Sequence, residues 1–120
     1  MTLYTAIGDE NLKLLVEAFY DRVFKSAIIS PLFNKTDAQT IKEKQFYFLT
    51  QFLGGPQRYH EKYGHPRMRM KHMPHKIDNA AKDEWLKLMK EAIETLPIDD
   101  ELKVALYNCF PKVAAHMVNR

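Results

Sequence analysis

His72 is the residue whose surroundings most clearly indicate chemistry. It closes a short helix predicted from Arg67 to Met73, and it follows Met68 by four residues, so the two share a helix face. Pro74 then turns the chain away. A histidine held between a helix end and a proline has a fixed direction, which suits the single axial protein ligand of a haem iron. A surface or capping histidine has the same spacing, so spacing alone leaves both interpretations open.

Four of the five histidines lie between His60 and His75, in the pattern H-x4-H-x6-H-x2-H. Zinc sites usually pair their ligands closely, and the single cysteine, Cys109, is distant, so the pattern disfavours zinc. The same region carries a basic run from Arg67 to Lys76 that contains no acidic residue. Such a run can bind nucleic acid, phosphate or carboxylates, although a solvated basic face is the more common outcome.

Tyr20 and Gln45 place polar groups where the apolar stripes of two predicted helices call for apolar residues. Buried polar groups need hydrogen-bond partners, and either residue alone is most simply a satisfied core residue. Two of them on different helices, in a chain with 12% aromatic residues, favour a polar patch inside an apolar cavity. Trp85 adds an indole N–H, which is rarely left unpaired when it is buried.

Length and composition limit the classes of protein. The 120 residues suffice for one domain with a real core, and 46% hydrophobic with 28% charged residues is ordinary for a globular chain. No apolar run approaches the roughly 20 residues of a membrane span, and no secretory signal is recognised. A single cysteine favours a reducing, cytoplasmic location. The net charge of +3 does not by itself indicate nucleic acid, and hydrolase, phosphate-loop and C-x-x-C motifs are absent from the sequence.

The hydrophobic periodicity predicts an all-α chain with four long helices and one short helix, without a domain boundary. They run from about Asp9 to Ser26, from a cap at Thr36 or Asp37 to Leu53, from Arg67 to Met73, from a cap at Asp78 to Leu96, and from a cap at Asp99 or Asp100 to Met117. Residues 57–66 are predicted to be loop. Pro111 conflicts with a continuous last helix, because an interior proline costs about 3 kcal/mol. We therefore expect a bend near Asn108 to Pro111, or two shorter helices.

Six segments have a distinctive order and spacing along nearly the whole chain. They are Phe19-Tyr20-Asp21-Arg22-Val23, Pro31-Leu32-Phe33, Leu53-Gly54-Gly55-Pro56, the run from Gly64 to Pro74, Trp85, and Ala115-His116-Met117-Val118-Asn119. The most specific feature is Gly-His-Pro, followed by His72 six residues after that proline and by Trp85 thirteen residues further on. Together these segments resemble the group II truncated haemoglobins of bacteria.

The resemblance implies an all-α truncated globin over residues 1–120, built as a two-over-two helical sandwich around haem b. It implies that His72 is the proximal iron ligand and that Tyr20, Gln45 and Trp85 face the bound ligand. Further haem-binding residues follow by position. Ile41 lies one turn before Gln45, and Phe33 packs on the haem from the preceding corner. Three basic residues match positions that reach the haem propionates, and they are Lys44, Lys76 and Arg69. The apolar haem contacts are Phe48, Leu49, Met68, Ile77, Met89 and Met117.

Two positions depart from the family pattern. His75 follows Pro74 where many members carry an aromatic residue, which puts a polar ring near the expected haem edge. Pro111 is not expected in the final helix of the family either.

The resemblance implies a haem protein that binds dioxygen, carbon monoxide, nitric oxide or similar small ligands in a polar distal pocket. The physiological role would then be redox or peroxidase-like chemistry on nitric oxide, peroxide or sulfide rather than oxygen transport. This chemistry would use the same site, and it would need an external electron donor. We expect a monomer or weak homodimer without a membrane or nucleic-acid partner. The alternative is a small basic all-α module without haem, whose segment from Arg67 to Lys76 contacts nucleic acid.

Overall fold

The computed structural model describes residues 2–33, 37–64 and 77–118, and every regular element within these ranges is helical. The elements are α1 (Leu3–Ile7), α2 (Asp9–Val23), the 3-10 turn η1 (Ser30–Phe33), α3 (Ala38–Phe52), α4 (Arg58–Tyr63), α6 (Asn79–Glu94), α7 (Asp100–Tyr107) and α8 (Pro111–Met117). The all-α prediction is confirmed.

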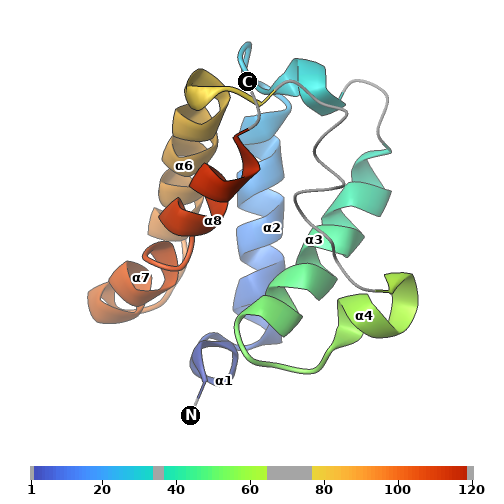
Figure 1. Ribbon diagram of the computed structural model, residues 1–120. Helices are drawn as coiled ribbons and strands as arrows, with labels where there is room; N and C mark the ends of the chain where they lie inside the picture. Colours follow the sequence, from blue (N-terminus) through green and yellow to red (C-terminus); the bar gives the residue numbers. More distant parts are fainter. Residues whose placement is uncertain (1, 34–36, 65–76, 119–120) are drawn as a thin grey trace.

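Helix α2 is the central helix of the fold and packs against both α3 and α6. Helix α2 runs through the middle of the molecule, with α3 on one side and α6 on the other (Figure 1). Helix α8 packs against α6, and the short α4 packs against α3. The core lies where these helices meet, and its largest fully buried side chains include Phe19 of α2, Leu49 of α3 and Met89 of α6. The apolar positions of each helix recur at helical spacing, so each helix turns one apolar side inwards.

Three of the helices begin at the aspartates that the sequence indicated. The carboxylates of Asp37, Asp78 and Asp99 each accept a hydrogen bond from the backbone N–H three residues further on, at 2.9, 2.9 and 2.8 Å. Each bond satisfies a backbone donor that the first helical turn leaves unpaired, and a cap of this kind is worth about 1 kcal/mol. Helix α2 ends at Val23, three residues before the predicted end. Ser26 lies beyond it and donates a 2.6 Å hydrogen bond to Glu84 of α6.

The predicted break near Pro111 is confirmed as two shorter helices. Helix α7 ends at Tyr107, and Pro111 is the first residue of α8. Proline is tolerated at the first helical position because its missing N–H would have no partner there. The conflict in the sequence therefore marks a helix start rather than a strained helix.

The prediction of a loop over residues 57–66 is wrong, because α4 occupies Arg58–Tyr63. Six residues are too few to show a helical period, and tertiary contacts hold this helix. The Tyr59 ring is buried edge-on against Phe48 of α3, with 6.2 Å between the ring centroids. Helix α1 was also not predicted, and the Tyr4 backbone N–H ties it to the Leu53 carbonyl at 3.0 Å. The short helix predicted from Arg67 to Met73 lies outside the described residues.

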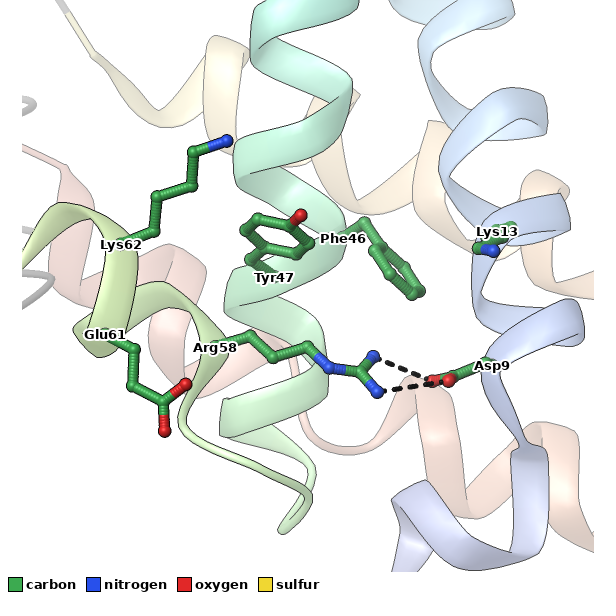
Figure 2. A pocket seen from close by; sticks show the side chains of 7 residues that line it. All are labelled: Asp9, Lys13, Phe46, Tyr47, Arg58, Glu61 and Lys62. Atoms are coloured by element: carbon green, nitrogen blue, oxygen red, sulfur yellow. Dashed lines mark hydrogen bonds and ion pairs between the residues drawn. The ribbon is translucent and has the colours of Figure 1, made fainter.

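An ion pair joins α4 to the beginning of α2. The Arg58 guanidinium donates to both carboxylate oxygens of Asp9, at 3.0 and 3.2 Å, as the two dashed lines in Figure 2 show. The Tyr4 hydroxyl donates to the same carboxylate at 2.8 Å. These hydrogen bonds, those of Arg58 above all, hold the pKa of Asp9 below its ordinary value. The carboxylate therefore connects α1, α2 and α4.

We expect Asp9→Asn to lower the melting temperature at neutral pH and to have a smaller effect in acid. Because the folded-state pKa of Asp9 is depressed, its stabilisation is present above the unfolded-state pKa and is lost as the pH falls through the folded-state pKa. The pair is partly exposed, so its contribution is about 1 kcal/mol or less. Thermal denaturation at several pH values measures the difference. Asp21→Asn, which changes an exposed carboxylate on the same helix, is the control. A difference that stays constant down to acid pH would contradict this role.

Candidate functional site

One face of α3 is apolar but only partly covered by the described part of the chain. Ile41, Gln45, Phe48 and Phe52 follow at intervals of four, three and four residues, which places them on one side of the helix. The first three are half-buried and Phe52 is 36% exposed, whereas Leu49 is fully buried. Covering an aromatic or aliphatic side chain completely contributes roughly 1.5–3 kcal/mol. This face is therefore suited to an apolar, flat ligand.

A row of aromatic rings extends this face from α3 to α6. Phe48 stacks on Phe52 with ring centroids 5.4 Å apart and planes inclined by 17°. Phe52 lies 6.0 Å from Phe110, which precedes α8, and Phe110 lies 5.7 Å from Trp85 of α6. The predicted contact Met117 is half-buried on α8. Ring faces and thioether side chains are the lining that a macrocycle such as porphyrin requires, so the described residues fit a haem.

Two of the three predicted ligand-facing residues meet at Phe19. The Tyr20 ring lies 5.0 Å from the Phe19 ring, and the Trp85 indole lies 5.2 Å from it, both edge-on. Tyr20 is 3% exposed, and its burial raises the pKa of the phenol above the ordinary value. The hydroxyl therefore keeps its proton at neutral pH and is a hydrogen-bond donor. Gln45 is half-buried on α3, which packs against the α2 helix that carries Tyr20.

The other predicted site residues lie partly within and partly outside the described ranges. Leu49, Met89 and Ile77 are buried, and their contact with haem stays a prediction. The Lys44 ammonium lies 5.3 Å from the centre of the Tyr63 ring, on the side of α3 that faces α4. His72, Met68, Arg69, Lys76 and the side chain of Phe33 lie outside the described residues, so their roles stay predictions.

Phe52 and Phe110 lie in the aromatic row but were not predicted as site residues. Phe52 follows Phe48 by four residues on the same helix face, and this spacing was a usable signal. No local pattern in the sequence predicted the position of Phe110, because its ring contacts Phe52 and Trp85 only where separate helices pack together.

The described residues do not support a metal site of another kind. Among residues 2–33, 37–64 and 77–118, no three histidine, cysteine or acidic side chains are grouped so that they could hold a metal ion. His60 is exposed on α4, and the other three histidines of the H-x4-H-x6-H-x2-H pattern lie outside the described residues. In the same ranges, no helix has the length and apolar character to cross a membrane.

A separate groove of about 650 Å³ lies between α2, α3 and α4 (Figure 2). Phe46 and Tyr47 line it from α3. The rest of the lining is charged and comes from Asp9, Lys13, Arg58, Glu61 and Lys62. Because most of its lining is charged, the groove differs in kind from the aromatic face.

The helices packed around α2, the aromatic face and the buried phenol of Tyr20 agree with a globin fold. The family described as bacterial-like globin matches residues 2–119. The group 2 truncated hemoglobin YjbI of Bacillus subtilis (strain 168) is 41% identical over 117 residues, which are 98% of this chain and 88% of that protein.

Solved structures agree with the family match. The group II truncated hemoglobin from Bacillus anthracis superposes with a TM-score of 0.93 at 36% identity, over 99% of this chain and 92% of that one. The truncated oxygen-avid haemoglobin from Bacillus subtilis does so with a TM-score of 0.93 at 40% identity, over 99% and 100%. The chain belongs to the bacterial-like globin family and is a group II truncated haemoglobin. Membership implies a haem cofactor and haem-based ligand binding, which favours the haem interpretation over the nucleic-acid alternative.

Proposed function

We propose that this protein binds haem b and, at the haem iron, dioxygen and other diatomic ligands such as carbon monoxide and nitric oxide. The observation that carries the proposal is the buried, protonated phenol of Tyr20, beside the same Phe19 ring that Trp85 contacts. Dioxygen bound at a haem would carry partial negative charge, so a phenol O–H and an indole N–H would stabilise it by donating hydrogen bonds. A relative from Bacillus subtilis, described as oxygen-avid, supports the choice of dioxygen.

In this proposal, haem supplies the iron chemistry, and the chain holds and surrounds it. His72 would hold the haem iron, and Tyr20, Gln45 and Trp85 would donate hydrogen bonds to the bound ligand. Lys44 and Lys76, with Arg69, neutralise the propionates. The remaining side chains exclude water from the haem faces, and they are Phe33, Ile41, Phe48, Leu49, Met68, Ile77, Met89 and Met117. Excluding water strengthens each hydrogen bond to the ligand, because the local dielectric constant is low.

The proposal also covers the setting in which the protein acts. We infer a single domain over residues 1–120, a cytoplasmic location, and a monomer or weak homodimer. Redox turnover on nitric oxide, peroxide or sulfide would consume electrons in every cycle, so the proposal includes an external electron donor.

An absorption spectrum tests the haem proposal directly. We expect the purified protein, after addition of ferric haem and gel filtration, to show a Soret band with one haem per chain. Dithionite should shift the band to that of the ferrous form, and carbon monoxide should shift it again, because the proposed site would bind this ligand at the haem. Elution without a Soret band would refute the haem proposal. A Soret band that carbon monoxide leaves unchanged would refute an open ligand site.

A further inference from the structure

A second series of rings leads from the aromatic face to the surface. The Phe48 ring, half-buried on α3, contacts the edge of Tyr59 at 6.2 Å between centroids. Tyr59 is 6% exposed and lies 5.1 Å from Tyr63, which is partly exposed at the end of α4. Tyr63 in turn lies 6.5 Å from Tyr47. Electron transfer between side chains falls steeply with the gap between them, so successive ring contacts carry an electron much better than one long jump.

The hydroxyl of Tyr63 faces a base. It donates a 2.5 Å hydrogen bond to Oε1 of Glu43, and the Lys62 ammonium bonds the same oxygen. A hydrogen bond from a neutral hydroxyl to an ionised carboxylate is short and strong, which agrees with this distance. The hydrogen bonds from Lys62 and Tyr63 hold the pKa of Glu43 below its ordinary value, so the carboxylate is ionised and can accept a proton.

A phenol gives up an electron readily only if its proton leaves as well, because an oxidised phenol that keeps its proton is a very strong acid. Glu43 is placed to take that proton from Tyr63. The ammonium groups of Lys44 and Lys62 lie 5.3 and 5.5 Å from the centre of the Tyr63 ring. They would oppose a positively charged ring, but the neutral radical left after proton transfer carries no charge for them to repel.

We propose that Tyr63 is a surface site of one-electron oxidation, with Glu43 as its proton acceptor and hydrogen peroxide as the oxidant that acts through the haem. The proposal rests on the haem function proposed above, because the path begins at Phe48, an expected haem contact. One electron leaves the Tyr63 ring and passes by way of Tyr59 and Phe48 to the oxidised haem. The O–H bond of Tyr63 breaks, its proton moves to Oε1 of Glu43, and a neutral tyrosyl radical remains.

The balance closes with two reagents from solution. Hydrogen peroxide takes up two electrons and two protons to become two molecules of water, so Tyr63 is oxidised twice for each peroxide, and each oxidation supplies one electron and one proton. A hydrogen-atom donor of the phenol class then transfers a hydrogen atom to the Tyr63 oxygen and becomes a radical itself. Glu43 releases its extra proton to water. Partly exposed Tyr63 can meet such a donor, whereas the 3%-exposed Tyr20 cannot.

Spin trapping tests the proposal in the haem-loaded protein. Hydrogen peroxide is added to the ferric protein with a nitroso spin trap, and peptide mass spectrometry locates the trapped radical. Freeze-quenched electron paramagnetic resonance measures the total tyrosyl signal. We expect the adduct on Tyr63 and a several-fold smaller tyrosyl signal in Tyr63→Phe. Glu43→Gln, which keeps the size of the side chain but removes the base, should also reduce Tyr63 labelling several-fold.

The matched control is Tyr107→Phe on α7. Tyr107 takes part in none of the ring contacts found among the described residues, so its removal should leave the Tyr63 adduct unchanged. Adducts on Tyr4, Tyr20 or Trp85 without one on Tyr63, at normal haem content, would overturn this inference and leave the haem function intact. Labelling that persists undiminished in Glu43→Gln would overturn the role of Glu43. A protein without a Soret band would instead refute the haem function itself.

Discussion

We expect His72→Gly to abolish the ordinary ferrous haem spectrum and free imidazole to restore it. In the proposed function, His72 is the protein ligand that the iron cannot do without. Glycine removes the imidazole and leaves room of about its size, so an exogenous imidazole can take the same coordination position. The measurement is the absorption spectrum of the dithionite-reduced protein, with and without carbon monoxide, during an imidazole titration. The effect should be complete, because no second ligand replaces His72 in the proposal.

His75→Gly and His60→Gly are the matched controls for this experiment. Both remove an imidazole from the same histidine-rich part of the sequence, and His60 is exposed on α4. Each should keep the spectrum of the unchanged protein. A native spectrum in His72→Gly, together with its loss in one of the other two variants, would show that the iron ligand is a different histidine.

Removing a hydrogen-bond donor from the proposed ligand pocket should speed oxygen release far more than carbon monoxide release. Each donor in a dry pocket contributes roughly 1–2 kcal/mol, so Tyr20→Phe and Trp85→Phe should each raise the oxygen dissociation rate roughly 5- to 30-fold. Bound carbon monoxide accepts hydrogen bonds poorly, so its dissociation rate should change much less. Stopped-flow displacement of each gas from the ferrous protein measures both rates.

The two substitutions preserve much of the aromatic packing. Phenylalanine at position 20 keeps the ring that contacts Phe19, and phenylalanine at position 85 keeps an aromatic side chain beside Phe19 and Phe110. The donors form a network in the proposal, so the double variant need not show the product of the single effects. Equal acceleration of both gases would indicate that these side chains control access by their size. Unchanged rates for both gases would mean that neither side chain faces the ligand.

The long helices and their starts were determined by local physics that the sequence displays. Helices α2, α3 and α6 are each about four turns long, and apolar residues recur along them at helical spacing. This repetition can be seen in the sequence without knowledge of any tertiary contact. The caps Asp37, Asp78 and Asp99 satisfy backbone donors only three residues away. Pro111 was also informative by itself, since a proline can begin a helix but not continue one. The resemblance to group II truncated haemoglobins rested on motifs of this local kind.

Helices α1 and α4 were decided by the tertiary structure. They contain five and six residues, which is less than two helical turns, and a helix of that length is not stable by itself in water. Helix α4 forms because Tyr59 is buried against Phe48 and because Arg58 pairs with Asp9, 49 residues earlier in the chain. Contacts between residues so far apart leave no periodic pattern in the sequence.

The site divides in the same way. Tyr20, Gln45 and Trp85 could be proposed from the sequence because each places a polar group on an apolar helix face. The ring row from Phe48 through Phe52 and Phe110 to Trp85 was not recognisable, because its members come from α3, the α7–α8 junction and α6. The hydrogen bond from Tyr63 to Glu43 likewise joins residues 20 positions apart on two helices. Residue type and spacing determine which chemistry a side chain can perform, but only the packing of helices determines which side chains meet.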